Sequence, residues 1–227
     1  MSNVIEVGGK KYKVTLEEVK EEVVEYPAPK FIASGVEMKT RWNAAPKGLV
    51  VHYHSGHADS RINSIPVLKL GQKNGYKYMC MEENGDVYYP NAKLSFWEHG
   101  WHCGSKHHYD HVGIEVINSG KLEKRDGKFY TWFDKEIPSN RVLAWRDEDN
   151  IVRGYYEAFT QEQIKSLVGL CHYLKDNYPS FSFDNVLGHD EVAPGRKNDP
   201  GGSLTMTMPE FRKLVKKTYA EKKSLNL

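Results

Sequence analysis

Residues 48–54 read GLVVHYH, a run of β-branched and other apolar side chains bounded by Pro46 and Gly56. A short apolar run between such breakers is typical of a strand that is buried inside a sheet. We therefore expect a buried strand here. Its last residues include two histidines, His52 and His54, at the point where the strand approaches a loop.

Further strands are predicted downstream. Residues 76–81 (YKYMCM) and 86–90 (DVYYP) indicate two strands joined by a tight turn centred on Asn84-Gly85. Residues 111–118 (HVGIEVIN) indicate another strand, and residues 185–192 (NVLGHDEV) indicate a short strand that runs into a loop.

The last third of the chain changes to helical periodicity. Residues 159–179 begin with Thr160 as N-cap and Gln163 three positions later, which is the arrangement of a capping box. Apolar side chains then recur on one helical face, at Ile164, Leu167, Val168, Cys171 and Leu174. Residues 210–223 (EFRKLVKKTYAEKK) predict a basic C-terminal helix. Strands interleaved with helices predict an α/β fold with a mixed sheet.

Composition excludes some classes of function. The 227 residues carry 32 Lys and Arg against 30 Asp and Glu, so the net charge is +2. A nucleic-acid binder that relies on a dominant positive field is therefore not expected. Hydrophobic residues make up 39% of the chain, which suffices for an ordinary packed core.

Three cysteines, Cys80, Cys103 and Cys171, lie far apart and form no C-x-x-C pair. We expect no disulfide framework and a reducing compartment of synthesis. The N-terminal residues lack the apolar run of a signal peptide, and no segment approaches the roughly 18 apolar residues of a membrane span. The chain is therefore expected to be cytoplasmic when synthesised, with any extracellular target reached by another route.

The N-terminal region differs from the rest in composition. It is rich in Lys and Glu, and residues 15–25 predict a short helix that ends before Pro27 and Pro29. We predict an N-terminal extension over residues 1–40, wrapped on a catalytic domain that spans residues 41–227 and includes the basic C-terminal helix.

A metal site is suggested by the histidines and by the loop 188–202 (GHDEVAPGRKNDPGG). The chain has no H-E-x-x-H, G-x-S-x-G, Walker or G-x-G-x-x-G motif. Catalytic zinc needs three protein ligands and an open position. His52 and His189 near strand ends, with Asp199 on a returning loop, would satisfy that need. From spacing alone, surface histidines and a solvated turn are the alternative.

Four stretches occur in the order found in one known family: residues 48–54 (GLVVHYH), 101–118 (WHCGSKHHYDHVGIEVIN), 157–174 (EAFTQEQIKSLVGLCHYL) and 186–202 (VLGHDEVAPGRKNDPGG). The chain resembles the type 2 N-acetylmuramoyl-L-alanine amidases, the superfamily that includes phage amidases and peptidoglycan recognition proteins. The resemblance spans roughly residues 38–214 and leaves the preceding residues unexplained. It implies a central mixed β-sheet flanked by helices, in a single catalytic domain.

The resemblance also implies a site. One zinc ion would be held by His52, His189 and Asp199, a set whose net positive charge acidifies bound water. Glu115 would act as the acid/base, although a solvent-facing strand glutamate is the alternative from the residues alone. Lys197 would stabilise the oxyanion that develops in the transition state.

Three further residues are predicted to bind substrate. Trp101 and His102 belong to a stretch that resembles the family's groove wall, and His54 follows the ligand strand. Core packing is the alternative for Trp101. A tyrosine on an earlier strand is implicated in some family members, and here the choice between Tyr76 and Tyr78 stays open.

The histidines His107, His108 and His111 have no counterpart in the family. We interpret them as exposed loop histidines, with a second metal site as the alternative.

The predicted function is zinc-dependent hydrolysis of the amide bond between N-acetylmuramic acid and L-alanine in peptidoglycan. A non-catalytic peptidoglycan-binding module and a zinc peptidase of the stem peptide are the alternatives. The biological context favours a monomeric phage endolysin, released by a holin-type partner to act on the bacterial cell wall. A cytosolic enzyme that recycles muropeptides is the alternative context.

Overall fold

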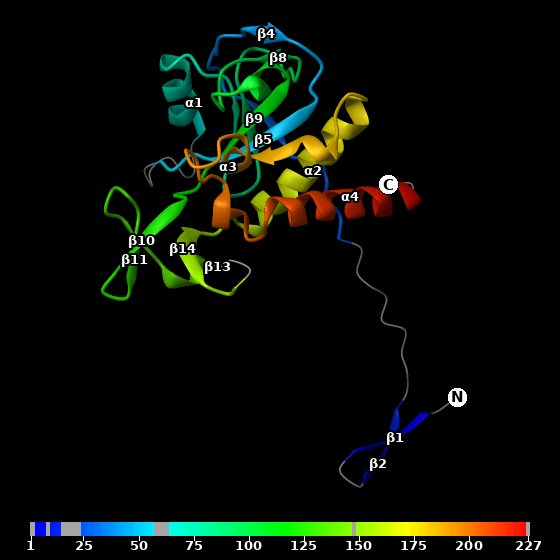
Figure 1. Cartoon of the computed structure of the whole chain (residues 1–227). Helices are drawn as coiled ribbons and strands as arrows, with labels where there is room; N and C mark the ends of the chain where they lie inside the picture. Colours follow the sequence, from blue (N-terminus) through cyan, green and yellow to red (C-terminus); the bar gives the residue numbers. More distant parts are fainter. Residues whose placement is uncertain (1–2, 8–9, 15–23, 57–63, 147–148, 226–227) are drawn as a thin grey trace.

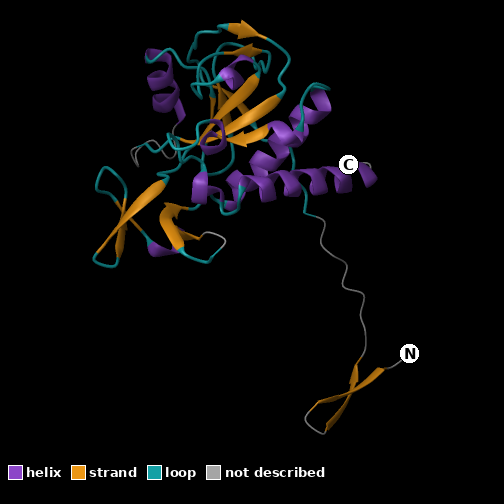
Figure 2. Cartoon of the chain, in the orientation of Figure 1, coloured by secondary structure: helices purple, strands orange, loops and turns teal. Residues whose placement is uncertain are grey.

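The computed structural model describes residues 3–7, 10–14, 24–56, 64–146 and 149–225 of the chain. A six-stranded sheet lies at its centre, with helices on both sides (Figures 1 and 2). No helix in these ranges has the length and apolar character needed to cross a membrane. The predicted α/β fold, a central mixed β-sheet flanked by helices in a single domain, is confirmed.

The central sheet has the strand order β15-β5-β9-β6-β7-β3. Its strands are β3 (Phe31–Ala33), β5 (Gly48–Tyr53), β6 (Met79–Met81), β7 (Val87–Tyr89), β9 (His111–Val116) and β15 (Val186–Gly188). β15, β5, β9 and β6 are mutually parallel, whereas β7 runs antiparallel to β6 across the predicted turn. The strands expected from residues 48–54, 76–90, 111–118 and 185–192 are all present.

Side chains alternate between two faces of this sheet. Leu49 and Ile114 point to the main core, which is shared with α2 (Gln161–Asn177) and α4 (Met208–Ser224). Cys80 points to the opposite face, where a smaller cluster includes α1 (Ser64–Lys73). α2 begins with the predicted capping box of Thr160 and Gln163. The helices predicted within residues 159–179 and 210–223 are confirmed, and α1 was not anticipated.

A second sheet, also unanticipated, has the order β12-β11-β10-β14-β13. Its strands are β10 (Lys121–Arg125), β11 (Lys128–Tyr130), β12 (Glu136–Ile137), β13 (Val142–Arg146) and β14 (Val152–Glu157). All of its pairings are antiparallel. This sheet and α1 lie on either side of the ends of β5 and β9 (Figure 1).

The prediction that a loop directly follows β15 is wrong. β15 leads directly into the short helix α3 (His189–Val192), so His189 is the first helical residue and not a loop residue. The Glu191 carboxylate accepts a hydrogen bond from the Gly188 N–H at 3.0 Å, which satisfies one of the unpaired donors of this helix start. Glu191 is also held by Arg212 of α4.

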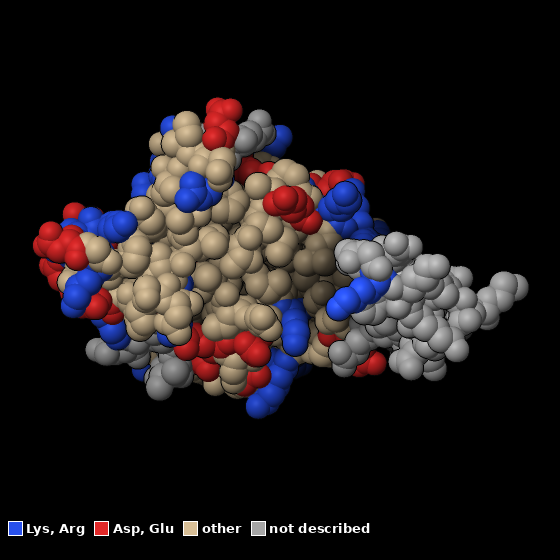
Figure 3. Space-filling model, turned by 90° about the horizontal axis from the view of Figure 1, so that it is seen from below, with Lys and Arg blue, Asp and Glu red and all other residues tan. Residues whose placement is uncertain are grey.

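Smaller elements complete the fold. β4 (Trp42–Asn43) pairs with β8 (Glu98–His99). Single turns of 3-10 helix occupy Lys106–Tyr109, Ser139–Arg141, Phe183–Asn185 and Gly201–Leu204. On the face shown in Figure 3, basic and acidic side chains are interspersed around a broad uncharged area.

The N-terminal region forms a hairpin of β1 (Asn3–Val7) and β2 (Lys10–Val14), which lies apart from the other sheets in Figure 1. Most of the helix predicted over residues 15–25 lies outside the described residues. The following segment contacts α2 closely, since a Cβ atom added to Gly169 would lie 1.9 Å from the Pro27 carbonyl oxygen. The division of the chain at residue 40 stays a prediction.

Candidate metal centre

The central sheet brings the three predicted ligands together. His52 is the fifth residue of β5, and β15 pairs with β5 so that Gly188 lies opposite Val51. His189 follows Gly188 and therefore emerges beside His52. The loop after α3 folds back, with the Asp190 N–H donating to the Asp199 carbonyl at 2.8 Å, and this places the Asp199 side chain at the same point.

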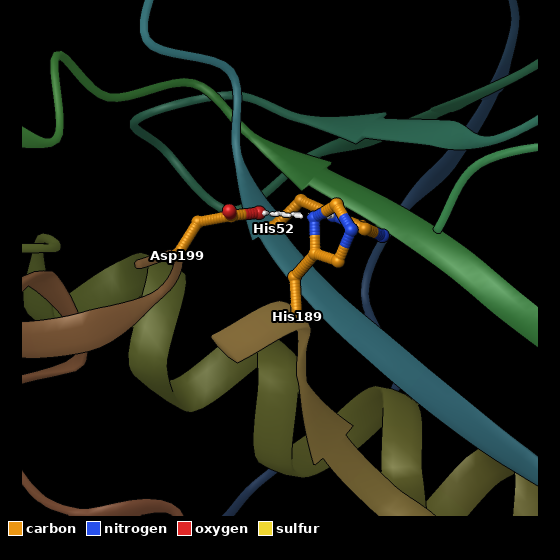
Figure 4. Close-up of side chains that lie close together, drawn as sticks. All are labelled: His52, His189 and Asp199. Carbon is orange, nitrogen blue, oxygen red and sulfur yellow. Dashed lines mark hydrogen bonds and ion pairs between the residues drawn. The ribbon is translucent and has the colours of Figure 1, made fainter. Parts of the chain in front are cut away.

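The ligand atoms converge tightly (Figure 4). The Nδ1 atoms of His52 and His189 are 2.9 Å apart, and Oδ2 of Asp199 lies 3.0 and 2.9 Å from them. All three residues are buried, with exposed fractions of 1%, 4% and 6%. Within the described residues this is the one group of three such side chains with the spacing of a metal site.

The chemistry of these donors fits a cation. His189 Nε2 lies 3.1 Å from the Cys103 carbonyl oxygen, which only accepts, so Nε2 carries a proton, and in the neutral tautomer this leaves Nδ1 with a lone pair. A lone pair and a carboxylate oxygen at 2.9 Å repel each other unless a positive charge lies between them. Two imidazoles and one carboxylate are a familiar ligand set for catalytic zinc.

Protonation favours the same interpretation. Burial is the main cause that lowers the pKa of His52 below its ordinary value, which leaves the ring neutral. Burial alone would raise the pKa of Asp199, but an N–H or a positive charge at the facing nitrogens of His189 and His52 outweighs that effect and holds the pKa well below the usual range. A neutral imidazole and an ionised carboxylate are the forms that bind metals.

Glu115 lies next to this group. The register of β5 and β9 pairs it directly with His52, and it points away from the core that its neighbours Ile114 and Val116 enter. Burial, followed by the charge of Asp199, raises the pKa of Glu115 well above its ordinary value, and Lys197 opposes this only in part. A carboxyl group in this state can hold a proton near neutral pH.

The loop that carries Lys197 is anchored at the residues on both sides of it. Arg196 donates to the Cys103 carbonyl at 3.0 Å, and Asn198 accepts a hydrogen bond from the Tyr53 hydroxyl. Lys197 itself lines the same cleft as Glu115 and Asp199. Its positive charge acts on both His52 and Glu115, so the ammonium group lies within electrostatic range of the candidate metal centre.

The centre opens into a cleft of about 1180 Å³. One wall follows α1 and includes Leu70, Asn74, Tyr76 and Trp101. The other wall belongs to the second sheet and its turns, and includes Lys121, Leu122, Glu123 and Trp132. Sequence reasoning missed Trp132, which is 66% exposed and whose indole N–H donates to the Ser55 carbonyl at 2.7 Å.

The residues predicted to bind substrate all line this cleft, but differ in their surroundings. Trp101 is 44% exposed, with the Arg41 guanidinium 3.8 Å from its ring centre, so it is not packed in the core. Burial lowers the pKa of His54 to about 4, so this ring is neutral. Both ring nitrogens of His102 have protein partners, His52 and the His111 carbonyl. Substrate contact by these residues stays a prediction.

The two candidate tyrosines are separated by their environments. Tyr78 is buried, and its hydroxyl donates to the Val67 carbonyl at 3.0 Å. Both tyrosines line the cleft, but Tyr76 is 42% exposed whereas Tyr78 is 6% exposed. Tyr76 is therefore better placed to meet a substrate.

The extra histidines differ from expectation. His111 is buried, 6% exposed, and bonded to Asp110 at 2.7 Å, so its interpretation as an exposed loop residue is wrong. His108 is half-buried and stacks on Trp42 with ring centres 5.0 Å apart. The structure groups no three metal-binding side chains here among its described residues.

Comparison with known proteins identifies the family. Residues 42–202 match the N-acetylmuramoyl-L-alanine amidase family, and this match covers most of the chain. The chain belongs to that family. The 1,6-anhydro-N-acetylmuramyl-L-alanine amidase AmpD of Salmonella typhimurium (strain SL1344) is 40% identical over 58 residues, which are 26% of this chain and 29% of AmpD. The aligned part is thus less than a third of that relative.

Solved structures share the fold at low sequence identity. The N-acetylmuramyl-L-alanine amidase AmiD from E. coli, in complex with anhydro-N-acetylmuramic acid-L-Ala-D-gamma-Glu-L-Lys, has a TM-score of 0.50 and 20% identity, covering 92% of this chain and 65% of AmiD. A mutant of the protein PlyL has a TM-score of 0.52 and 13% identity, covering 82% of this chain and 98% of PlyL.

Proposed function

We propose that this protein is a zinc-dependent N-acetylmuramoyl-L-alanine amidase, which hydrolyses the amide bond between N-acetylmuramic acid and L-alanine. One zinc ion would be held by His52, His189 and Asp199. The observation that carries the proposal is the convergence of these three side chains beside Glu115, in a chain that belongs to this family.

Each residue has a distinct task. Bound zinc would supply an acidified water and a Lewis acid for the substrate carbonyl. Glu115 takes a proton from the attacking water and delivers one to the alanine amine as the amide bond breaks. Its raised pKa suits a group that must carry a proton between the two events. Lys197 shares the negative charge that develops on the carbonyl oxygen.

The substrate would lie in the cleft between the two walls. Trp101 and Trp132, one on each wall, offer exposed aromatic surface for the sugar or the peptide. The AmiD structure contains an anhydro-muramyl peptide, and a related ligand is proposed here.

The decisive experiment is digestion of purified peptidoglycan followed by mass analysis. An amidase releases intact stem peptides with a free alanine amine. Cuts within the stem peptide would instead identify a peptidase. An unchanged wall that retains the protein would identify a binding module, and either result would overturn the proposal. If a Glu115→Ala protein keeps zinc and full activity, Glu115 is not the acid/base.

Two biological contexts remain as proposals. The match to AmpD supports recycling of soluble muropeptides. An open cleft of about 1180 Å³ is compatible with an endolysin that acts on the cell wall. Under the endolysin hypothesis the chain is a monomer released by a holin-type partner. Comparing rates on intact sacculi and on soluble anhydro-muropeptides distinguishes the two contexts.

A further inference from the structure

The segment Trp101–Gly104 contacts both candidate ligand histidines on the side that faces away from the candidate metal centre. Nδ1 of His102 lies 3.2 Å from Nε2 of His52. The Cys103 carbonyl oxygen lies 3.1 Å from Nε2 of His189. Two consecutive residues therefore meet the two ring nitrogens that face away from the candidate metal centre.

The partners determine where the protons lie. Nε2 of His102 is 3.2 Å from the His111 carbonyl oxygen, which can only accept, so His102 carries its proton on Nε2. Nδ1 of His102 is then an acceptor, and Nε2 of His52 must donate to it. This leaves a lone pair on Nδ1 of His52, directed at His189 and Asp199.

We infer that His102 and the Cys103 carbonyl are the positioning groups of the metal centre. They hold His52 and His189 in the tautomers whose Nδ1 atoms face the metal. The inference rests on the proposed function, because it concerns the same zinc site. In metal centres, partners of this kind fix the orientation of ligand histidines and strengthen metal binding.

The surrounding structure holds the two positioning groups in place. The His102 ring packs directly against the backbone of β9, since a Cβ atom added to Gly113 would lie 2.7 Å from Cγ of His102. Arg196 donates to the Cys103 carbonyl at 3.0 Å, so this oxygen is fixed from the loop that also carries Asp199. The position of His102 is thus set by the sheet, and that of the Cys103 carbonyl by the ligand loop.

This assignment differs from the predicted substrate contact of His102. Because both of its ring nitrogens are engaged within the protein, a substrate would have to displace one of these bonds to reach them. A positioning role predicts an effect on zinc affinity, whereas a substrate role predicts an effect on KM alone.

The test compares His102→Leu with His102→Asn. The two replacements have nearly the same shape, but only the asparagine amide oxygen can accept from His52 at the place of Nδ1. Zinc affinity would be measured by competition with a chromogenic chelator. We expect His102→Leu to weaken zinc binding by about 10- to 100-fold, the usual range for such partners. His102→Asn should recover most of that loss.

Three outcomes decide the matter. Wild-type zinc affinity in His102→Leu would overturn the inference while leaving the proposed function intact. Equal losses in both variants, with equal falls in thermal midpoint, would show a packing role and also overturn it. A wild-type protein that binds no zinc would refute the proposed metal site itself. Nitrogen-15 shifts of the metal-free protein give a second readout, since His52 should lose its single Nε2–H tautomer only in His102→Leu.

Discussion

The two sheets that enclose the cleft are built in different ways. In the central sheet, β5 is buried at every position, and β9 is buried at every position except Glu115. In the second sheet, β10 and β11 are mostly exposed or half-buried, and only Leu122 among their residues is buried. The central sheet contributes His52 and Glu115, whereas the second sheet contributes the wall with Lys121, Glu123 and Trp132.

The central sheet thus positions the groups proposed for catalysis, and the second sheet forms a wall of the cleft. Of the groups that converge within about 3 Å, His52 lies on a buried parallel strand and His189 directly follows another, while Asp199 is held beside them by the hydrogen bond from the Asp190 N–H to its carbonyl. Groups that only have to present a surface come from exposed strands and turns. Residues of the same type therefore occur at the centre and away from it, and such pairs allow the proposed roles to be tested.

The largest effect is expected at the centre itself. His189→Ala removes one of the three ligands, so we expect the zinc content to fall from about one ion per chain towards zero and hydrolysis to be lost with it. The measurement is metal analysis of the purified protein together with wall digestion. His107→Ala, a histidine outside the cleft lining, is the control and should retain its zinc. Equal zinc in wild type and His189→Ala would refute the site.

The next effect compares two carboxylates that line the same cleft. Glu115→Gln should lower kcat by about 10²- to 10⁴-fold with zinc retained, because a general acid/base is lost. Glu123→Gln, on the second sheet, should stay near the wild-type rate. Initial rates on solubilised peptidoglycan measure both. Similar losses in the two variants would show that net charge in the cleft, and not proton transfer by Glu115, governs the rate.

Two lysines form the third pair. Lys197→Met should reduce kcat by about 10²- to 10³-fold, the range for loss of one group that stabilises an oxyanion. Lys121→Met, on the opposite wall, should alter KM more than kcat. Separate determination of kcat and KM on a soluble muramyl peptide distinguishes them. A loss at Lys197 confined to KM would assign it to binding.

The same contrast explains how much could be predicted from sequence. GLVVHYH and HVGIEVIN are continuous apolar runs, and burial on both sides of a parallel sheet produces such runs. The strand KLEKR at residues 121–125 has no comparable pattern, because pairing and not burial maintains it. Propensity reasoning therefore found five of the six strands of the central sheet, all except β3, and missed the second sheet.

The candidate site divides similarly. His52, His189, Asp199, Glu115 and Lys197 were proposed from motif positions, and the structure brings them to one cleft. The contact of His102 with His52 was not predictable, since it spans 50 positions and depends on how the segment before β9 packs against Gly113 of that strand. Trp132 gave no signal either, because a single tryptophan in a polar turn has no periodicity to indicate its direction.

The smallest effect tests the wall itself, through two exposed tryptophans. Trp132 is 66% exposed and lines the cleft, while Trp97 is 52% exposed and lies outside the cleft lining. Trp132→Ala removes one aromatic surface from a substrate that still reaches an intact centre, so KM on peptidoglycan should rise about 2- to 10-fold with kcat nearly unchanged. Trp97→Ala should leave both constants unchanged.

The effect of Trp132→Ala should also depend on substrate size. If the second sheet holds the glycan, the rise in KM will be larger on intact wall than on a soluble muramyl peptide. Equal rises on both would place the ring against the part that the two substrates share. An unchanged KM on both would show that this wall only encloses the centre, and would leave Trp101 as the aromatic contact to test.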